Sequence, residues 1–301
     1  MIDLTAPPSL DRLSVADRLR TRRSWRTAKN NLASVMMVLS LVVVSVPLVL
    51  VIATVVGRGA GVISLDFLTK DIPIVSRSKG PGMGPAIVGT FLISAVAAAI
   101  AIPLGIFGAI YLNEYGGKSV FAKFVRFMSY VMTGVPSIVM GLFVYVIFTL
   151  RFHLMGLGGS LALACLMLPI VIRSTEEMLR LVPNGLREAS LALGARRSRT
   201  IVTVVMPAAL PGVLSGCLLA VARATGETAP LIFTIGAATK LNLNPFHQAT
   251  TALSTQIFTN ATSPFAGAQE RAWGAALTLV AIAFAFTVVA RIVSARFAAR
   301  R

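Results

Sequence analysis

Long runs without a charged residue are the feature that most constrains this chain. The first of them, Leu32–Gly57, contains 26 residues. A helix needs about 20 apolar residues to cross the hydrocarbon core of a bilayer, so this run predicts a spanning helix. It is too long for the apolar core of a signal peptide, so we expect no cleavage. Only 13% of all residues are charged, about half the share of a soluble domain, and we therefore expect an all-α, polytopic membrane protein.

The apolar runs predict about six spans in one transmembrane domain, residues 32–301, preceded by a basic leader, residues 1–31. The spans are expected near 32–57, 85–112, 127–150, 160–176, 207–235 and 272–290. Two spans carry residues that interrupt helices, namely Pro103 with Gly105, and the segment Gly134–Ser137 around Pro136. Because proline removes a backbone hydrogen bond, we expect a kink or break at both places.

One uncharged segment, Leu241–Gln269, is ambiguous. Charge alone would make it a seventh span. It also contains many polar side chains, including Asn242, Asn244 and Gln248, so we predict an outside loop with amphipathic pieces. A seventh span would also place the arginine-rich C-terminal segment outside, against the positive-inside rule.

The net charge of +17 is explained by topology. With six spans, 20 of the 28 lysines and arginines fall on one side, in the leader, the 113–126 turn, the 173–205 segment and the C-terminal segment. Only seven fall on the other side. The positive-inside rule makes the basic side cytoplasmic, so we expect both termini in the cytoplasm and a location in the plasma (inner) membrane. Membrane lipid is the expected partner of this surface, and nucleic acid is not.

The sequence offers no chemistry of an enzyme. Cys165 and Cys217 lie in apolar runs and are predicted to be buried and inert. There is no CxxC pair, no metal-ligand spacing and no GxxxxGK[ST] motif. We expect no catalytic residue, no metal and no cofactor, and any ATP must be bound by another chain.

Arg223 and Glu227 are set into the apolar run 207–235. An ionised residue inside a bilayer is costly and is therefore a functional-site hypothesis. The two residues are four apart, so they share one face of a helix. A guanidinium stays charged and holds two oxygens of an anion, which predicts an anion path; a structural ion pair is the alternative.

Arg173 lies nearer the inner end of the 160–176 span. It either lines the same path or extends to the interface and pairs with Glu176 or Glu177. The residues alone leave both interpretations open.

The segment 177–205 is charged and predicts a short helix outside the lipid. Asn184 is expected to cap this helix, and Glu188 is expected near its start, where a negative charge suits the helix dipole. Gly194 is expected to end it in a conformation that other residues avoid. On these grounds the helix either merely joins two spans or offers a docking surface to another protein.

A family resemblance distinguishes these alternatives. Glu188, Ala189 and Ser190, with Gly194 and Pro207 at the matching distances, resemble the EAA loop of ABC importer permeases; Ser190 replaces the second alanine of the pattern. The resemblance implies a type I ABC importer permease fold. It also implies that Glu188, Ala189, Ser190 and Gly194 couple the chain to a cytoplasmic ATPase.

Three further stretches are similar to the phosphate importer permeases of the Pst system: Pro169–Glu176, Leu179–Arg187 and Ala222–Leu231. This resemblance implies a subunit that moves inorganic phosphate into the cytoplasm by alternating access, with Arg223, Glu227 and Arg173 on the path. The implied partners are a second, PstC-like permease, two PstB-like subunits that hydrolyse ATP, and an extracytoplasmic PstS-like phosphate-binding protein.

Other functions remain to be weighed. An importer for another oxyanion, such as sulfate or molybdate, would use the same chemistry. An ion-coupled secondary transporter would use Glu227 for protons and need no ATPase. A membrane-bound enzyme is a third class, but no span presents a nucleophile, metal set or acid–base pair. The EAA-like loop argues against the last two.

Overall fold

The computed structural model describes residues 25–75, 77, 82–117 and 119–298, and every regular element within these ranges is a helix. Most of the predicted leader, together with Lys79, Lys118 and the last three residues, lies outside the described residues. The chain divides into two units, Met1–Thr54 and Val55–Arg301, and each is described by itself.

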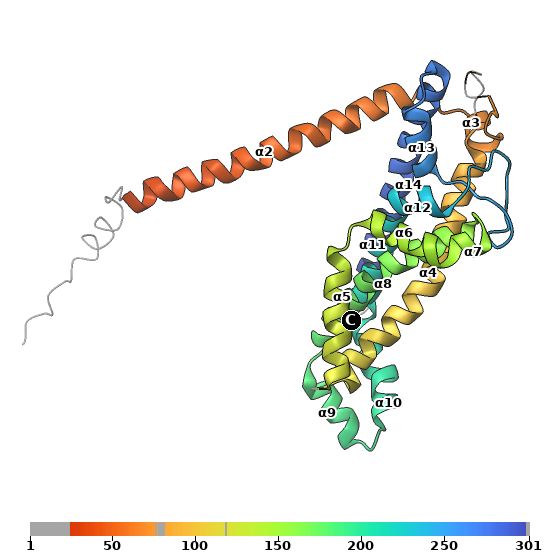
Figure 1. The fold of residues 1–301 in the computed structure, drawn as a ribbon. Coiled ribbons are helices and arrows are strands. Elements are labelled where there is room, and N and C mark those ends of the chain that lie inside the picture. The colour runs from red at the N-terminus through yellow and green to blue at the C-terminus, as the bar shows by residue number, and fades with distance from the viewer. Residues whose placement is uncertain (1–24, 76, 78–81, 118, 299–301) are drawn as a thin grey trace, which may run out of the picture. The chain divides into compact units, whose positions relative to one another are not determined.

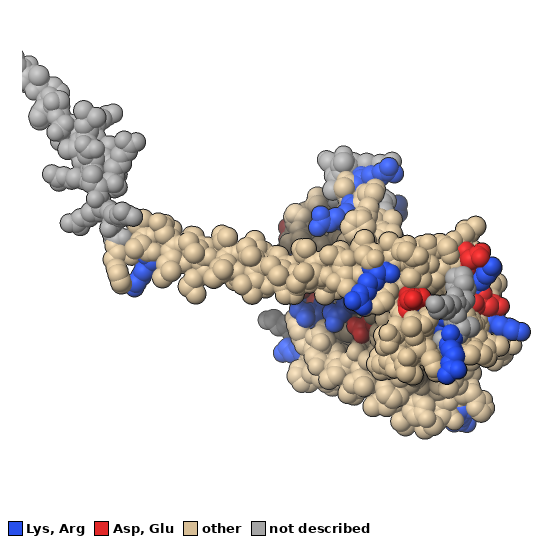
Figure 2. Space-filling view, turned by 90° about the horizontal axis from the view of Figure 1, so that it is seen from above, with Lys and Arg blue, Asp and Glu red and all other residues tan. Residues whose placement is uncertain are grey.

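The described part of the first unit belongs to helix α2, Trp25–Gly59. Its surface is almost wholly free of charge along its length (Figure 2). Three of its hydroxyl groups bond within the helix: Ser40, Ser45 and Thr54 donate to carbonyls three or four residues earlier, at 2.7–2.8 Å. Between Leu32 and Gly57 the helix carries no charged residue, which suits a lipid environment.

The second unit is a helical bundle centred on α8, Gly156–Arg180 (Figure 1). Helix α8 packs against α4, Gly84–Ile110, and against α11, Met206–Thr225, and α11 packs in turn against α14, Ala266–Ala298. The buried core is formed where these helices meet, and Leu163, Met167 and Val171 of α8 lie in it.

Small residues allow α4 to approach α8 closely. Ile93, Ala97, Ala101, Gly105 and Ala109 follow one another at every fourth position and are all buried. A Cβ atom at Gly105 would lie only 2.6 Å from a methyl group of Val171, so this crossing requires glycine. Such small-residue interfaces are typical of helices that associate within membranes.

Among the described residues, five helices are long and apolar enough to cross a membrane, or six if a bent pair is one span, in agreement with the prediction of about six. The first half of the pair is α5, Val120–Gly134. The second half begins with α6, Ser137–Val144. It continues through the π-helical turn η2, Tyr145–Thr149, into the short helix α7, Leu150–Phe152. The two halves meet at 108°. The predicted interruption around Pro136 is therefore a sharp break, whereas α4 runs without a break through Pro103.

The predicted 207–235 span is also interrupted. Helix α11 ends at Thr225, and a separate short helix, α12, covers Ala229–Thr234. At its other end the helix extends beyond the prediction, because α10, Arg197–Thr200, and the π-helical turn η3, Ile201–Val205, lead directly into α11.

The loops gather at opposite ends of the second unit (Figure 1). At one end lie α3, Leu65–Thr69, and α13, Leu253–Ala261, and there the Ile72 N–H donates to the Thr239 carbonyl at 3.0 Å. At the other end lie α10 and α9, Asn184–Ala192. Because α13 has only nine residues, it is too short to be a seventh span.

Candidate functional site

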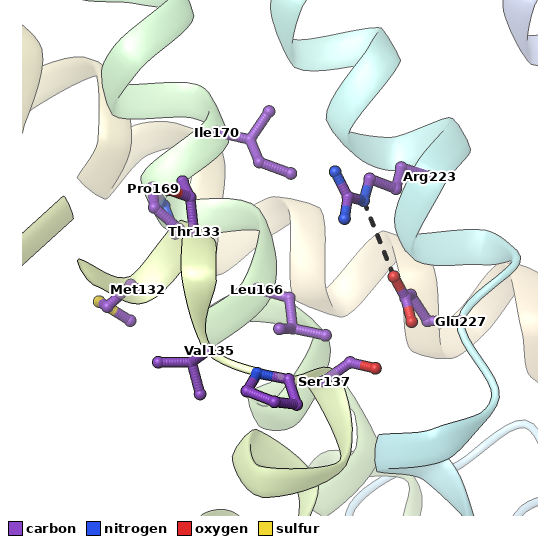
Figure 3. Close-up of a pocket in the computed structure, with 10 residues that line it drawn as sticks. Met132, Thr133, Val135, Ser137, Leu166, Pro169, Ile170, Arg223 and Glu227 are labelled. Carbon is purple, nitrogen blue, oxygen red and sulfur yellow. Dashed lines mark ion pairs between the residues drawn. The ribbon is translucent and has the colours of Figure 1, made fainter. Parts of the chain in front are cut away.

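A cavity of about 230 Å³ lies where the two broken spans face α8 (Figure 3). Three elements supply its lining: the α5–α6 break, the middle of α8, and the end of α11. The lining residues are Met132, Thr133, Val135, Pro136, Ser137, Leu166, Pro169, Ile170, Arg223 and Glu227.

The first break follows from proline chemistry. A proline disfavours the helical conformation of the residue before it, and Val135 is extended, with φ −71° and ψ 129°. Pro136 has no N–H to continue the helix, and α6 begins directly after it. Irregular backbone within a membrane is tolerated where it is buried in protein or lines a cavity, and this break lines one.

The second break is fixed by neighbouring helices. The Ser254 hydroxyl of α13 donates to the Glu227 carbonyl at 3.0 Å. The Thr225 hydroxyl lies 3.4 Å from the Ser94 hydroxyl oxygen of α4. The chain between α11 and α12 is therefore held on two sides, which keeps Arg223 and Glu227 beside the cavity.

The Arg223 side chain is poorly held within its own chain. It is 69% exposed, and its Nε lies 3.8 Å from the Glu227 carboxylate, which is too long for a hydrogen bond. No described residue forms a hydrogen bond with the guanidinium. Since this group carries five N–H donors in a planar fork, it remains free to bind an anion.

The structure brings two of the three predicted path residues together and separates the third. Arg223 and Glu227 both line the cavity, but Arg173 does not. The Arg173 guanidinium stacks on the Tyr130 ring, 4.7 Å from its centroid, and lies 3.9 Å from the Glu177 carboxylate. Of the two predicted acidic neighbours, Glu177 is therefore the one beside it.

Sequence reasoning missed the contribution of Thr133, Pro136 and Ser137 to the cavity. Their signal was present as the predicted interruption of the apolar run at Gly134–Ser137. A polar, helix-breaking segment within a span is itself evidence of a cavity, because its backbone groups need partners.

The predicted coupling residues lie on and beside α9. Glu188 and Ala189 are exposed, and the Ser190 hydroxyl pairs with that of Thr200 at 2.9 Å. Gly194 follows the helix with φ +83°, a left-handed conformation that glycine adopts freely, as predicted.

Two details of the predicted helix were wrong. Pro183 occupies the cap position and Asn184 is the first helical residue, without a side-chain capping bond. The Asn184 side-chain oxygen instead accepts a hydrogen bond from the Arg187 guanidinium at 3.2 Å. The first turn of α9 contains no acidic residue, because the helix begins at Asn184 and Glu188 lies in its middle.

Two solved transporters share the fold. A subunit of a bacterial alginate ABC transporter, solved in complex with an alginate-bound periplasmic protein, superimposes with a TM-score of 0.65 at 14% identity, over 91% of this chain and 98% of that one. A chain of the MetNI methionine ABC transporter superimposes with a TM-score of 0.56 at 17% identity, over 71% of this chain and 93% of that one. The fold is therefore that of the type I ABC importer permeases.

Sequence relatives give a narrower result. Residues 101–301 match the family described as "Binding-protein-dependent transport system inner membrane component". The phosphate transport system permease protein PstA of Mycobacterium leprae is 42% identical over 276 residues, 90% of each chain. PstA of Yersinia pestis is 38% identical over 278 residues, 92% of this chain and 94% of that one. The chain therefore belongs to the family of binding-protein-dependent inner membrane permeases, in its PstA branch, which confirms the resemblance found in the sequence.

Proposed function

We propose that this chain is a permease subunit of a phosphate ABC importer, and that it moves inorganic phosphate into the cytoplasm by alternating access. The observation that carries the proposal is the Arg223 guanidinium, which is exposed, forms no hydrogen bond within the described part of the chain, and lies at a cavity between two broken spans. The relatives named PstA support phosphate as the anion.

The lining of the cavity fits an oxyanion. A planar guanidinium binds two oxygens of a phosphate in parallel, and it remains charged at every physiological pH. The Ser137 hydroxyl lines the same cavity and is able to donate to a further oxygen, whereas the Thr133 hydroxyl, also in the lining, donates to the Tyr130 carbonyl at 2.7 Å. Glu227, 3.8 Å from Arg223, competes with the anion for the guanidinium and so favours its release.

The proposal includes partner chains. Two PstB-like ATPase subunits hydrolyse ATP and receive α9, a PstC-like permease completes the pore, and a PstS-like protein delivers phosphate. Leucines exposed at 47–89% on this polar loop give the ATPase an apolar contact surface: Leu181, Leu186, Leu191 and Leu193. In this arrangement the end with α9 faces the cytoplasm, where both termini also lie.

The test is ATP-dependent phosphate uptake by proteoliposomes that contain the whole complex. Arg223→Gln is expected to reduce uptake at least 100-fold while the subunits still co-purify. Arg223→Lys keeps the charge but loses the fork, so it should retain part of the activity. Asp66→Asn removes an exposed carboxylate at the opposite end and serves as the matched control.

Normal uptake by an assembled Arg223→Gln complex would refute the assignment of Arg223. Competition by excess sulfate or molybdate tests the choice of anion separately. Inhibition of labelled phosphate uptake by either oxyanion, at concentrations where unlabelled phosphate inhibits, would show that the importer is not specific for phosphate.

A further inference from the structure

The α9 end of the bundle contains two buried carboxylates that the transport chemistry does not use. Glu114 lies in the π-helical turn η1, Tyr111–Tyr115, which continues α4, and its side chain is only 7% exposed. Glu176 lies in the last turns of α8 and is also 7% exposed. Burial of a carboxylate is costly unless arginines and other donors compensate it, so each needs an explanation.

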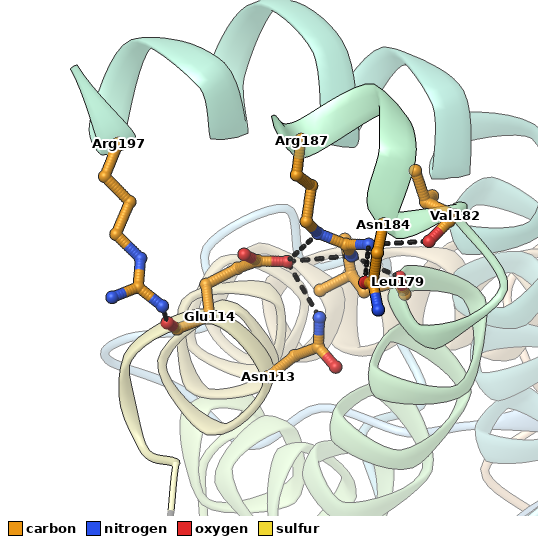
Figure 4. Close-up of polar contacts among 7 residues, drawn as sticks. All are labelled: Asn113, Glu114, Leu179, Val182, Asn184, Arg187 and Arg197. Carbon is orange, nitrogen blue, oxygen red and sulfur yellow. Dashed lines mark hydrogen bonds and ion pairs between the residues drawn. The ribbon is translucent and has the colours of Figure 1, made fainter. Parts of the chain in front are cut away.

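Glu114 holds the coupling helix α9 to the end of α4 (Figure 4). Its carboxylate accepts from the Arg187 guanidinium at 3.0 and 3.3 Å, and from the Asn113 amide at 2.8 Å. The remaining donors of Arg187 bind the carbonyls of Leu179 and Val182, at 2.8 and 2.6 Å. One arginine therefore ties α9, the end of α8 and η1 to one another.

A second arginine reaches the same turn from α10. Arg197 donates to the Glu114 carbonyl, and its guanidinium lies 5.1 Å from the centroid of the Tyr115 ring. The two helices that flank the Gly194 turn are thus both attached to η1, on either side of the exposed coupling residues. A displacement of this loop has to move η1 as well.

Glu176 continues the connection to α5. Its carboxylate accepts from Arg126 of α5 and from Arg180 of α8, both at 2.7 Å. Arg126 also donates to the Leu112 carbonyl of η1 at 2.9 Å. Leu112, Ala122 and Ile172 form a buried apolar cluster at the same place. Since this cluster lowers the local dielectric, the ion pairs there are stronger than on an open surface.

These contacts form an unbroken path from the coupling loop to the anion cavity. The path runs from α9 through Arg187 and Glu114 to η1, and from Leu112 through Arg126 to α5. Met132 and Thr133, which line the cavity, lie six and seven residues further along α5. At 1.5 Å per residue this is about 10 Å of uninterrupted helix.

We propose that Glu114 and Glu176 are positioning residues that make the coupling loop, η1 and α5 move as one body. Movement of the ATPase then reaches the cavity wall instead of being absorbed between the helices. The inference rests on the proposed function, because it assigns these carboxylates to the coupling step of that transport. It predicts that loss of either carboxylate uncouples ATP hydrolysis from phosphate uptake, without changing the binding of the anion by Arg223.

The test combines two measurements on the whole complex with Glu114→Gln, Glu176→Gln and the control Asp66→Asn. The ratio of phosphate taken up to ATP hydrolysed should fall at least tenfold in both glutamine variants and stay unchanged in the control. Glu114→Asp keeps the charge and should recover part of the ratio, which a purely steric role would not predict.

A conformational measurement tests the path independently of the transported anion. Reporter fluorophores are placed at Ser198→Cys in α10 of the coupling loop or at Val131→Cys on α5 next to the cavity lining, both exposed positions, after both native cysteines are replaced by alanine. With intact carboxylates, binding of non-hydrolysable ATP should shift both reporters. In Glu114→Gln, the loop reporter should still shift and the cavity reporter should not.

Several results would overturn the inference. A wild-type uptake ratio, or a normal shift of both reporters, in an assembled Glu114→Gln complex would refute it. If this variant does not assemble, Arg126→Met serves instead, because methionine keeps an apolar side chain of similar length but donates to neither the Leu112 carbonyl nor Glu176. Full coupling in that variant would refute the path equally. Failure of Arg223→Gln to affect uptake, with the coupling results as expected, would refute the assignment of Arg223 and leave the path intact.

Discussion

Arg223 and Arg187 show two opposite uses of an arginine within one bundle. Arg187 is 16% exposed and is bound by a carboxylate, a side-chain amide oxygen and two backbone carbonyls. Arg223 is 69% exposed, and its one ion-pair partner in the part of the chain that the structure describes is the Glu227 carboxylate at 3.8 Å. An arginine whose donors are all engaged fixes structure, whereas one whose donors are free binds ligand. The number of engaged donors therefore distinguishes the α9 end of this permease from its proposed anion site.

The strongest test of this contrast is Glu114→Ala. It leaves the Arg187 guanidinium buried without its carboxylate, and breaking a buried pair in this way costs about 3–5 kcal/mol. The two carbonyls that Arg187 retains place the expected loss near the lower end, about 3 kcal/mol. Chemical denaturation of the purified complex would measure it. A change comparable to that of Arg223→Ala, which should lie within about 1 kcal/mol of wild type, would remove the contrast.

Glu227→Gln should affect rate and leave stability unchanged. The pair with Arg223 is long and partly exposed, so its loss costs at most about 1 kcal/mol of folding free energy. If the carboxylate displaces the anion from Arg223, the maximal uptake rate should fall about tenfold, equivalent to about 1.4 kcal/mol in the barrier. Uptake at saturating phosphate and a denaturation curve measure the two quantities. Lower stability at an unchanged rate would instead make the pair structural.

Arg173→Gln should have a smaller effect, because this side chain lies outside the cavity and rests on Tyr130. We expect less than a threefold change in uptake, together with loss of one cation–π contact worth about 0.5–1 kcal/mol. The same phosphate uptake assay measures this change. A loss as large as that of Arg223→Gln would return Arg173 to the anion path, where the sequence allowed it.

Asp66→Asn should have the smallest effect. Its pair with Lys70 is short, 2.6 Å, but both side chains are more than half exposed. Exposed pairs contribute about 0–1 kcal/mol, so neither stability nor uptake should change measurably. A loss similar to that of Glu114→Ala would show that pairing distance, and not burial, determines how much these carboxylates contribute.

Periodicity and charge predicted much of the fold, because each span is a local property of about 20 residues. The number of spans, the break around Pro136 and the left-handed Gly194 all follow from residues adjacent in sequence. The end of α11 at Thr225 was missed although Gly226 caps the helix and Pro230 lies in the first turn of α12, because the apolar run itself continues to Ile235. That break is held by Ser94 and Ser254, which lie more than 25 residues away from it.

The site was predictable to the same extent. Arg223 and Glu227 were found because ions within an apolar run are conspicuous. Glu114 and Arg126 were missed because charges in a short turn usually face water, and only the fold shows that Glu114 is buried and that Arg126 is bound by the buried Glu176. Arg173 remained ambiguous in the sequence, because snorkelling and lining a path place the same residue at the same depth; its stacking on Tyr130 depends on how α5 packs against α8.

The pairing of Glu114 with Arg187 also has a consequence for biosynthesis. The two residues are 73 positions apart, so at ribosomal rates of 5–20 residues per second Arg187 is made about 4–15 s after Glu114. Throughout that interval the Glu114 carboxylate lacks its partner Arg187, and η1 cannot form its contacts with α9. The α9 end of the bundle therefore matures late, after α4, α5 and α8 have all been made. A nascent chain that stops before the coupling loop keeps an unsatisfied acidic group at this end, which distinguishes it chemically from a finished one.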